Sequence, residues 1–386
     1  MALSRKGKFK IILLFEILIV LALAVCAVLL VYMGKIQRTG IDKKNVNANE
    51  IPGFTNIMLF GVDARGSELL SNTRSDTMIL CSINEKTHEV TLTSFYRDYY
   101  AFSPEKAGAD SPVKLDSSEF DKLTHAYNDG PEAAIKTINT NFDLDITDFV
   151  TVNFIALVRV IDKLGGIEIN VPDYLVSEVN KYGGEIAKKN KEPFKRLTKG
   201  GLQKLDGYQA LGYSRTRKKD SDFKRSQRQR EVLNKVFETF KDKASVSNAN
   251  AIYNAISKNM ATSFSNKDLI KLLADAGKYK IRTETNNDYG NGFPYHAVEY
   301  KPRGISCQIS KTPREDVVLL HYNLFNNGVL PQELLDLSTT SPSATNNATA
   351  KPSTSSEDKG YGYQYKPSAT VDLITRYIQS CYDSAY

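Results

Sequence analysis

Charged residues gather at the ends of three apolar segments that we expect to be strands, residues 56–62, 77–83 and 89–95. Ligand sites in open α/β sheets lie beyond the carboxyl ends of the strands, so acidic and basic side chains there could hold a divalent cation and an anionic substrate. Structural ion pairs are the alternative explanation for the same pattern. The strand-end residues with this chemistry are Asp63, Arg65, Arg74, Asp76, Arg97 and Asp98.

A second group of candidates lies in a basic stretch, residues 187–230, which holds fifteen Lys or Arg and four Asp or Glu. The stretch runs into an expected helix over residues 222–243, where Arg225 and Gln229 continue the apolar face of Leu233. That face should pack inward, and a buried guanidinium needs an anion. The positive end of the helix strengthens the preference for a phosphate.

Arg215 and Arg217 precede this helix and share one face if their segment is extended. We therefore expect Arg215, Arg217 and Arg225 to converge with Arg97 around one pocket. A solvated basic face and a nucleic-acid-binding patch are the alternatives. The second is disfavoured because residues 1–44 carry +6 of the net charge of +7, which leaves +1 for the rest of the chain.

Several familiar catalytic patterns are absent from the sequence. The four His and four Cys show no zinc-binding spacing, and the chain has neither a P-loop nor a G-x-S-x-G turn. The residues alone therefore indicate an α/β protein with an Arg-rich, metal-assisted phosphate site.

A long apolar segment near the N-terminus predicts a membrane anchor. Residues 11–33 contain one charged side chain, Glu16, and as a helix they would reach about 34 Å, enough to cross a bilayer. A signal peptide has a shorter apolar core. Basic residues precede and follow the span in similar number, but a basic start favours a cytoplasmic N-terminus. We expect the protein in the cell membrane, with the rest of the chain outside.

The remaining sequence predicts an α/β (α+β) body with a mixed central sheet flanked by helices. Residues 173–204 form a polar, Gly- and Lys-rich excursion from it. We divide the chain into a cytoplasmic N-terminus (1–10), a transmembrane helix (11–33), a stalk (34–54), the body (55–330), a Ser/Thr/Pro-rich linker (331–358) and a helical tail (359–386).

These clusters, in this order, resemble the LytR–CpsA–Psr family of cell-envelope phosphotransferases, from about residue 56 to residue 327. The motifs that carry the resemblance are N-I-M-L-F-G-V-D-A-R from Asn56, R-S-D-T-M-I-L from Arg74, S-F-Y-R-D from Ser94, K-L-T-H-A-Y from Lys122, L-G-G-I-E-I-N-V-P from Leu164, L-D-G-Y-Q-A-L-G-Y-S-R-T-R from Leu205 and D-F-K-R-S-Q-R-Q from Asp222. Lys224 and Tyr96 stand where family members often have a small residue. Neither departure removes a charged group, so we expect activity.

The resemblance implies a fold, an activity and partners. Family members have a single N-terminal span and an outer catalytic domain. They transfer a glycopolymer from a polyprenyl pyrophosphate lipid carrier to a hydroxyl of peptidoglycan, as in the attachment of wall teichoic acids and capsules. The implied partners are therefore the lipid-linked glycopolymer, peptidoglycan and membrane lipid, with no nucleic acid.

The resemblance also implies roles for single residues. Asp63 and Asp76 would bind Mg²⁺, with Mn²⁺ as an alternative. The catalytic set would be Asp63, Asp76, Arg97 and Asp98. The pyrophosphate would be bound by Arg65, Arg74, Arg97, Arg215, Arg217, Arg225 and Gln229. Asp63 and Asp98 remain equal candidates for the general base.

Other functions are compatible with parts of the same pattern. A hydrolase of polyprenyl pyrophosphates and a non-catalytic wall-polymer binder would use the same pocket. A transcriptional attenuator, an older label of the family, is disfavoured by the membrane span and by the near-neutral body.

Two cysteines outside the predicted span suggest a link between the tail and the body. Cys307 and Cys381 would both lie in an oxidising compartment, where disulfides persist. We expect a Cys307–Cys381 disulfide that ties the C-terminal helix to the body.

Overall fold

The computed structural model describes residues 36–63, 69–108, 115–216, 222–242, 257–265, 267–269, 272, 276–282, 292–329 and 364–385. None of the helices in these segments is long and apolar enough to cross a bilayer. The expected span 11–33, the linker 331–358, Arg65 and Arg217 all lie outside the described residues.

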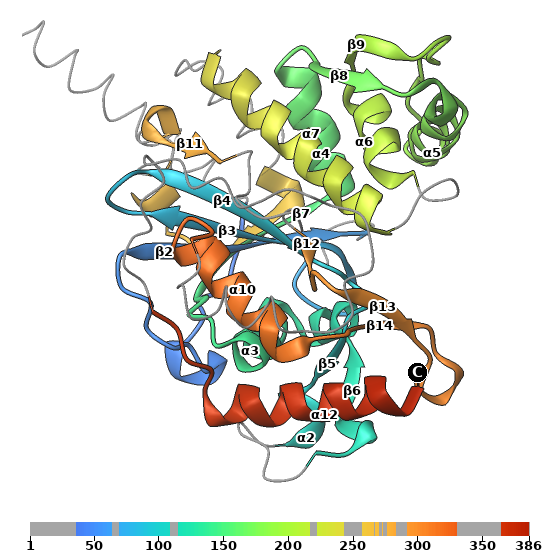
Figure 1. The fold of residues 1–386 in the computed structure, drawn as a ribbon. Coiled ribbons are helices and arrows are strands. Elements are labelled where there is room, and N and C mark those ends of the chain that lie inside the picture. Colours follow the sequence, from blue (N-terminus) through green and yellow to red (C-terminus); the bar gives the residue numbers. More distant parts are fainter. Residues whose placement is uncertain are drawn as a thin grey trace, which may run out of the picture.

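A mixed eight-stranded sheet forms the middle layer of the fold, as the sequence predicted (Figure 1). Strand β2 is antiparallel to β3 on one side and parallel to β7 on the other, and β4 continues the sheet beyond β3. The order is β1-β10-β7-β2-β3-β4-β11, with β12 also paired to β4. The strands are β1 (Gln37–Arg38), β2 (Phe54–Val62), β3 (Ser75–Asn84), β4 (Glu89–Phe95), β7 (Asp148–Asn153), β10 (Met260–Thr262), β11 (Lys280–Ile281) and β12 (Gly292–Phe293).

Both faces of the sheet are covered, because its central strands are apolar at nearly every position. Along β2, Met58 and Phe60 pack into the core on one face, whereas Ile57 and Leu59 belong to the opposite face. A strand that is buried on both sides carries a continuous apolar run instead of an alternating one. This explains why the first two strands were recognisable as unbroken apolar segments.

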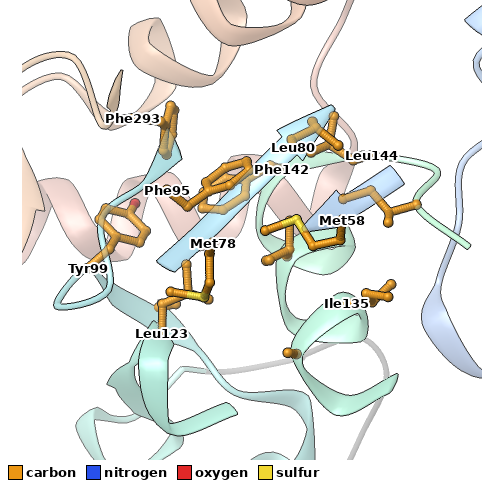
Figure 2. Close-up of a cluster of buried hydrophobic side chains, with 14 of the residues drawn as sticks. Met58, Met78, Leu80, Phe95, Tyr99, Leu123, Ile135, Phe142, Leu144 and Phe293 are labelled. Atoms are coloured by element: carbon orange, nitrogen blue, oxygen red, sulfur yellow. The ribbon is translucent and has the colours of Figure 1, made fainter. Parts of the chain in front are cut away.

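One face of the sheet packs on helices α3 (Pro131–Phe142), α10 (Pro313–Phe325) and α12 (Ala369–Ala385), which lie below it in Figure 1. A large hydrophobic cluster, the lower core, fills this layer, and Figure 2 shows its centre. The ring of Phe142 lies 5.3 Å from that of Phe95 and 4.7 Å from that of Phe293, measured between centroids. Aromatic packing therefore joins α3 to the ends of β4 and β12.

Short elements complete the lower side of the fold. Strands β5 (Tyr100–Phe102) and β6 (Phe120–Lys122) form one hairpin, and β13 (Ala297–Tyr300) and β14 (Cys307–Ser310) form another. Both hairpins contribute apolar residues to the lower core. The short helices on both sides of the sheet are α2 (Pro104–Ala107), η1 (Lys43–Val46), η2 (Ser117–Glu119), η3 (Leu123–Asp129), η4 (Asp173–Leu175), η5 (Ser257–Asn259), η6 (Ala276–Lys278) and η7 (Pro302–Gly304), and η4 belongs to the upper layer described next.

The other face of the sheet is covered by an upper layer with its own hydrophobic clusters. Figure 1 shows it as a group of helices and a hairpin above the sheet. Its elements are α4 (Phe154–Lys163), β8 (Ile167–Val171), α5 (Val176–Lys189), β9 (Gly201–Leu205), α6 (Gly207–Arg215) and α7 (Asp222–Asp242). The polar excursion expected over residues 173–204 is thus mostly a helix and a strand.

Glycines permit the close packing of three upper helices. A Cβ atom on Gly212 of α6 would lie 2.4 Å from the carbonyl oxygen of Val179 in α5. One on Gly207 would lie 2.3 Å from the carbonyl oxygen of Val158 in α4. Because no side chain fits at these distances, α6 needs glycine at both positions. The same packing fixes the place of Arg215, the last residue of α6.

The segment expected to be a stalk, residues 34–54, belongs to the body from Ile36 onward. Strand β1 pairs with β10 in the central sheet, and Val46 and Ile51 are buried in the lower core. The side chain of Asn139 donates a hydrogen bond of 2.8 Å to the carbonyl oxygen of Val46. The polar composition of the segment concealed these few widely spaced apolar anchors.

The predicted disulfide is wrong, since Cys307 and Cys381 are both free thiols. Cys381 is instead hydrogen-bonded to the hydroxyl of Tyr300. The C-terminal helix is held by packing and by hydrogen bonds, among them one of 2.7 Å from the backbone N–H of Ser368 to Asp143. The residues of α12 buried in the lower core are Val371, Ile374 and Ile378.

Replacing Gly212 with alanine tests the glycine contact. We expect Gly212→Ala to lower the free energy of unfolding by about 1–3 kcal/mol, because α6 must move away from Val179. Thermal unfolding of the full chain in detergent measures the change. The control is Gly40→Ala, where nothing lies within 4 Å of the added Cβ. Equal stability of the two variants would contradict the packing argument.

Candidate active site

A cavity of about 410 Å³ lies between the upper face of the sheet and the upper helices. The lining is mostly apolar, and its charged and polar groups come from the strand ends and from helices α6 and α7. Its apolar lining includes Leu59, Ile79, Val150, Phe154, Leu157, Leu211, Val232 and Leu233. Its polar lining includes Asp76, Arg97, Asn153, Ser214, Arg215, Arg225 and Gln229. The cavity is thus suited to a molecule with an anionic head and an apolar body.

Asp76 enters the cavity because the pairing of β2 and β3 is irregular at this point. Gly61 pairs with Thr77 and Val62 pairs with Ser75, so Asp76 has no partner in the register. Such a bulge turns a side chain away from its regular direction. It places the carboxylate at the sheet edge, where β2 ends and β3 begins.

An ion pair joins Asp76 to Arg97, the residue that follows the end of β4 by two positions. The guanidinium also lies 3.4 Å from a carboxylate oxygen of Asp98, and the other oxygen of Asp98 is 3.1 Å from Nζ of Lys122. Arg97 therefore lies between two carboxylates, of which only Asp76 lines the cavity.

The K-L-T-H-A-Y segment holds these charged residues in place. The backbone N–H of Thr124 donates to the carbonyl oxygen of Arg97 at 2.9 Å, and its hydroxyl donates to the carbonyl oxygen of Ser75 at 2.9 Å. Thr124 thus links the residue before Asp76 to Arg97. The sequence marked this segment as a motif but gave no role for Lys122 or Thr124.

Two arginines reach the cavity from the upper helices. The guanidinium of Arg215 lies 4.6 Å from the ring centroid of Phe154, at the start of α4. Arg225 is only 7% exposed and lines the cavity with Gln229, so the inward face of α7 deduced from the helical period is present. Arg97, Arg215 and Arg225 therefore surround one cavity.

Not every candidate lies in the lining. Asp63 and Arg74 are exposed at the same edge of the sheet, and Asp98 lies behind Arg97. Arg228, which is also buried, donates a hydrogen bond of 2.7 Å to the carbonyl oxygen of Thr216 and thereby ties α7 to the end of α6.

Arg230 is a charged residue that the sequence analysis did not single out. It is 7% exposed, and its Nη1 has no hydrogen-bond partner among the residues that the structure describes. Burial lowers the pKa of Arg230 to about 10, although the nearby Tyr96 and Tyr295 oppose this shift. A buried cation without a counter-ion costs stability. Its place beside Tyr96, the residue before Arg97, puts it next to the site.

The carboxylates of Asp63 and Asp76, at the edge of the sheet, are the expected ligands of Mg²⁺. Within the described segments, no group of three or more His, Cys, Asp or Glu side chains could hold an ion. Mg²⁺, however, often binds through one or two carboxylates together with substrate phosphates. Asp63 follows the end of β2, and Asp76 lies at the start of β3, the neighbouring antiparallel strand. These two carboxylates therefore fit such a Mg²⁺ site.

Comparison with known proteins settles the family. The model of the LytR_cpsA_psr family matches residues 33–301, more than half of the chain. The chain belongs to this family. The resemblance found in the sequence motifs is therefore confirmed.

Relatives and solved structures agree with this assignment. The polyisoprenyl-teichoic acid–peptidoglycan teichoic acid transferase TagU of Enterococcus faecalis is 30% identical over 262 residues, 67% of this chain and 77% of the relative. Biofilm regulatory protein A of Streptococcus mutans is 36% identical over 251 residues, 62% of this chain and 57% of the relative. The structure of TagT bound to LI-WTA covers 76% of this chain and 100% of its own, with 25% identity and a TM-score of 0.55.

Two arginines of α7 allow a matched test of the buried charge. We expect Arg230→Met to raise the free energy of unfolding by about 1–2 kcal/mol, because it removes a buried cation without a described partner. Arg228→Met should lower it by about 1–3 kcal/mol, because the carbonyl oxygen of Thr216 loses its donor. Thermal unfolding of the full chain measures both. A loss of stability in Arg230→Met as large as in Arg228→Met would contradict the assignment.

Proposed function

We propose that this protein is a membrane-anchored phosphotransferase that moves a glycopolymer from a polyprenyl pyrophosphate carrier to peptidoglycan outside the cell membrane. The observation that carries the proposal is that three arginines and an apolar lining share one cavity. A polyprenyl pyrophosphate has the same division into an anionic head and an apolar chain. The name of the TagU relative describes a transfer of this kind.

The arginines bind and orient the pyrophosphate. Arg97, Arg215 and Arg225 come from three different elements, so their guanidiniums can contact the two phosphates from different sides. Gln229 adds an amide on the same face of α7 as Arg225. We assign Arg65, Arg74 and Arg217 to pyrophosphate binding as well, on the basis of their motifs alone.

The transfer itself needs positioning and charge neutralisation more than a covalent intermediate. A hydroxyl oxygen of peptidoglycan attacks the phosphorus that carries the glycopolymer, and the bond from this phosphorus to the bridging oxygen breaks. The electron pair leaves on polyprenyl phosphate, whose negative charge the arginines stabilise. The proton of the hydroxyl passes to a general base.

Mg²⁺, with Mn²⁺ as an alternative, would be held by Asp63 and Asp76 and would neutralise charge on the phosphates. Asp76 uses one carboxylate oxygen for Arg97, so the other can meet the ion. Asp63 is exposed at the edge where an acceptor would arrive. Asp98 is engaged by Arg97 and Lys122 and positions Arg97, whereas Asp63 would be engaged by the ion, so both stay candidates for the general base.

A turnover experiment tests the proposal against its rivals. Full-length protein in detergent is incubated with a short sugar on a polyprenyl pyrophosphate, with and without an acceptor glycan. Transfer predicts a sugar-phosphate product on the glycan only when the acceptor is present. Release of sugar phosphate into water without regard to the acceptor would indicate a hydrolase, and an unchanged substrate would indicate a binding protein.

The proposed orientation has a separate test. Protease added outside intact protoplasts should digest residues beyond 34 while sparing the N-terminus before residue 11. Protection of the body in intact cells would refute the outer location.

Asp76→Asn tests the metal. We expect this variant to fold normally and to lose transfer activity by about 10²-fold or more, because the ion loses a charged ligand at the phosphates. Raising Mg²⁺ or offering Mn²⁺ should restore part of the activity. Initial rates across a metal titration measure the effect.

The control for this variant is Asp372→Asn, which removes a surface carboxylate paired with Arg314 on the far side of the sheet. It should keep wild-type activity at every metal concentration, since a surface pair contributes little. Wild-type transfer that continues undiminished in excess chelator would show that Asp63 and Asp76 bind no metal needed for the reaction.

A further inference from the structure

The β8–β9 hairpin displays an apolar side chain on a rigid support. Leu202 of β9 is 72% exposed, and Tyr174, just beyond β8, is 50% exposed. The opposite face of the hairpin is buried in the upper layer through Ile167, Ile169 and Leu205. The hairpin is therefore fixed to the body, and Leu202 stands on its outer face opposite Asn170.

The segment that contains Leu202 has a basic surface, although Glu168 of β8 is also exposed and pairs with Lys204 in the register. Between residues 173 and 206, the exposed acidic residues are Asp173 and Glu185. The exposed basic residues of the same segment are Lys181, Lys188, Lys189, Lys191, Lys195, Arg196, Lys199 and Lys204. A basic surface with a projecting leucine is complementary to an anionic bilayer, which offers phosphates at its surface and an apolar layer just below.

The same part of the molecule borders the cavity. Tyr182 of α5 and Leu211 of α6 belong to the cavity lining, and both helices pack directly on one another. If the cavity takes a polyprenyl chain, as proposed above, that chain must pass from the bilayer into the protein. A membrane contact beside α5 and α6 would shorten this path.

We propose that the outer face of the β8–β9 hairpin and the basic surface of residues 181–204 form a second membrane contact, in which the basic residues meet anionic headgroups and Leu202 reaches the acyl layer just below them. The inference rests on the proposed function at one point, namely that a polyprenyl chain enters the cavity from the bilayer. An N-terminal anchor limits the distance of the body from the bilayer, whereas a second contact also fixes which side faces it. An anionic wall polymer could use the lysines, but it would leave the exposed leucine unexplained.

The absence of tryptophan from the chain allows a direct measurement. Leu202→Trp places a single tryptophan on the hairpin, and Ile305→Trp places one at another exposed apolar position, 49% exposed beside β14 and the lower core. Each full-length variant is reconstituted into vesicles of phosphatidylglycerol and phosphatidylcholine, with or without bromine on the acyl chains. Co-flotation with the vesicles verifies reconstitution.

We expect brominated lipid to quench the tryptophan of Leu202→Trp and to leave that of Ile305→Trp nearly unchanged. Replacing Lys188 and Lys189 by glutamine in the Leu202→Trp background should weaken the contact by about fivefold for each charge, at about 1 kcal/mol per lysine. Equal quenching of the two tryptophans, or none in either, would overturn the proposal. So would a response of Leu202→Trp to a soluble anionic polymer but not to brominated lipid.

The quenching measurement is independent of the proposed reaction, because its vesicles contain no substrate. Transfer by the same variant is measured separately, with the lipid-linked sugar and acceptor glycan described above. Transfer by Leu202→Trp without quenching would refute the membrane contact and leave the phosphotransferase intact. Quenching without transfer would support the contact and count against the enzyme. Leu202 lies outside the cavity lining, so the substitution leaves the catalytic residues unchanged.

Discussion

The ion pair between Asp76 and Arg97 is the contact on which the rest of the site depends. It connects the start of β3 to the turn after β4, and the bulge opposite Gly61 and Val62 places its carboxylate at the cavity. Asp98, itself paired with Lys122, contacts the guanidinium from behind, and Thr124 fixes the backbone of Arg97. A half-buried arginine held in this way has lost most of its freedom before a ligand arrives, so it binds an anion at a lower entropic cost.

The cavity persists because the upper layer cannot collapse onto the sheet. Helices α4, α5 and α6 are packed on each other through Gly207 and Gly212, and the hairpin completes this unit. Helix α7 is tied to it by the hydrogen bond from Arg228 to Thr216. These contacts hold the upper helices together as one unit. The apolar residues of this unit that face the sheet are thereby kept at a distance from the apolar residues of the strands, which leaves the cavity between them. An apolar space of this kind costs stability, which is a reason to connect it with binding.

The sequence predicted what local patterns determine and missed what distant contacts determine. The apolar runs of β2, β3 and β4 and the inward direction of Arg225 follow from period and composition. The burial of Val46 depends on Asn139, 93 residues away, and the anchoring of α12 depends on Asp143, which no spacing reveals. The disulfide between Cys307 and Cys381 was predicted wrongly because the sequence does not show that the thiol of Cys381 is hydrogen-bonded to Tyr300.

In the site, too, the sequence predicted what local patterns determine and missed what distant contacts determine. The motifs identified Asp76, Arg97, Arg215, Arg225 and Gln229, which line one cavity although they lie up to 153 residues apart in the sequence. The helical period singled out Arg225 and Gln229, which line the cavity, but it gave no role to Arg228, which donates to the carbonyl oxygen of Thr216. Three residues of a helix rotate by about 300°, so Arg225 and Arg228 lie only about 60° apart, and it is the contact with Thr216 at the end of α6, not the spacing, that separates their roles. Helix α7 thus uses one basic motif both to hold its own layer together and to charge the polar end of an apolar cavity.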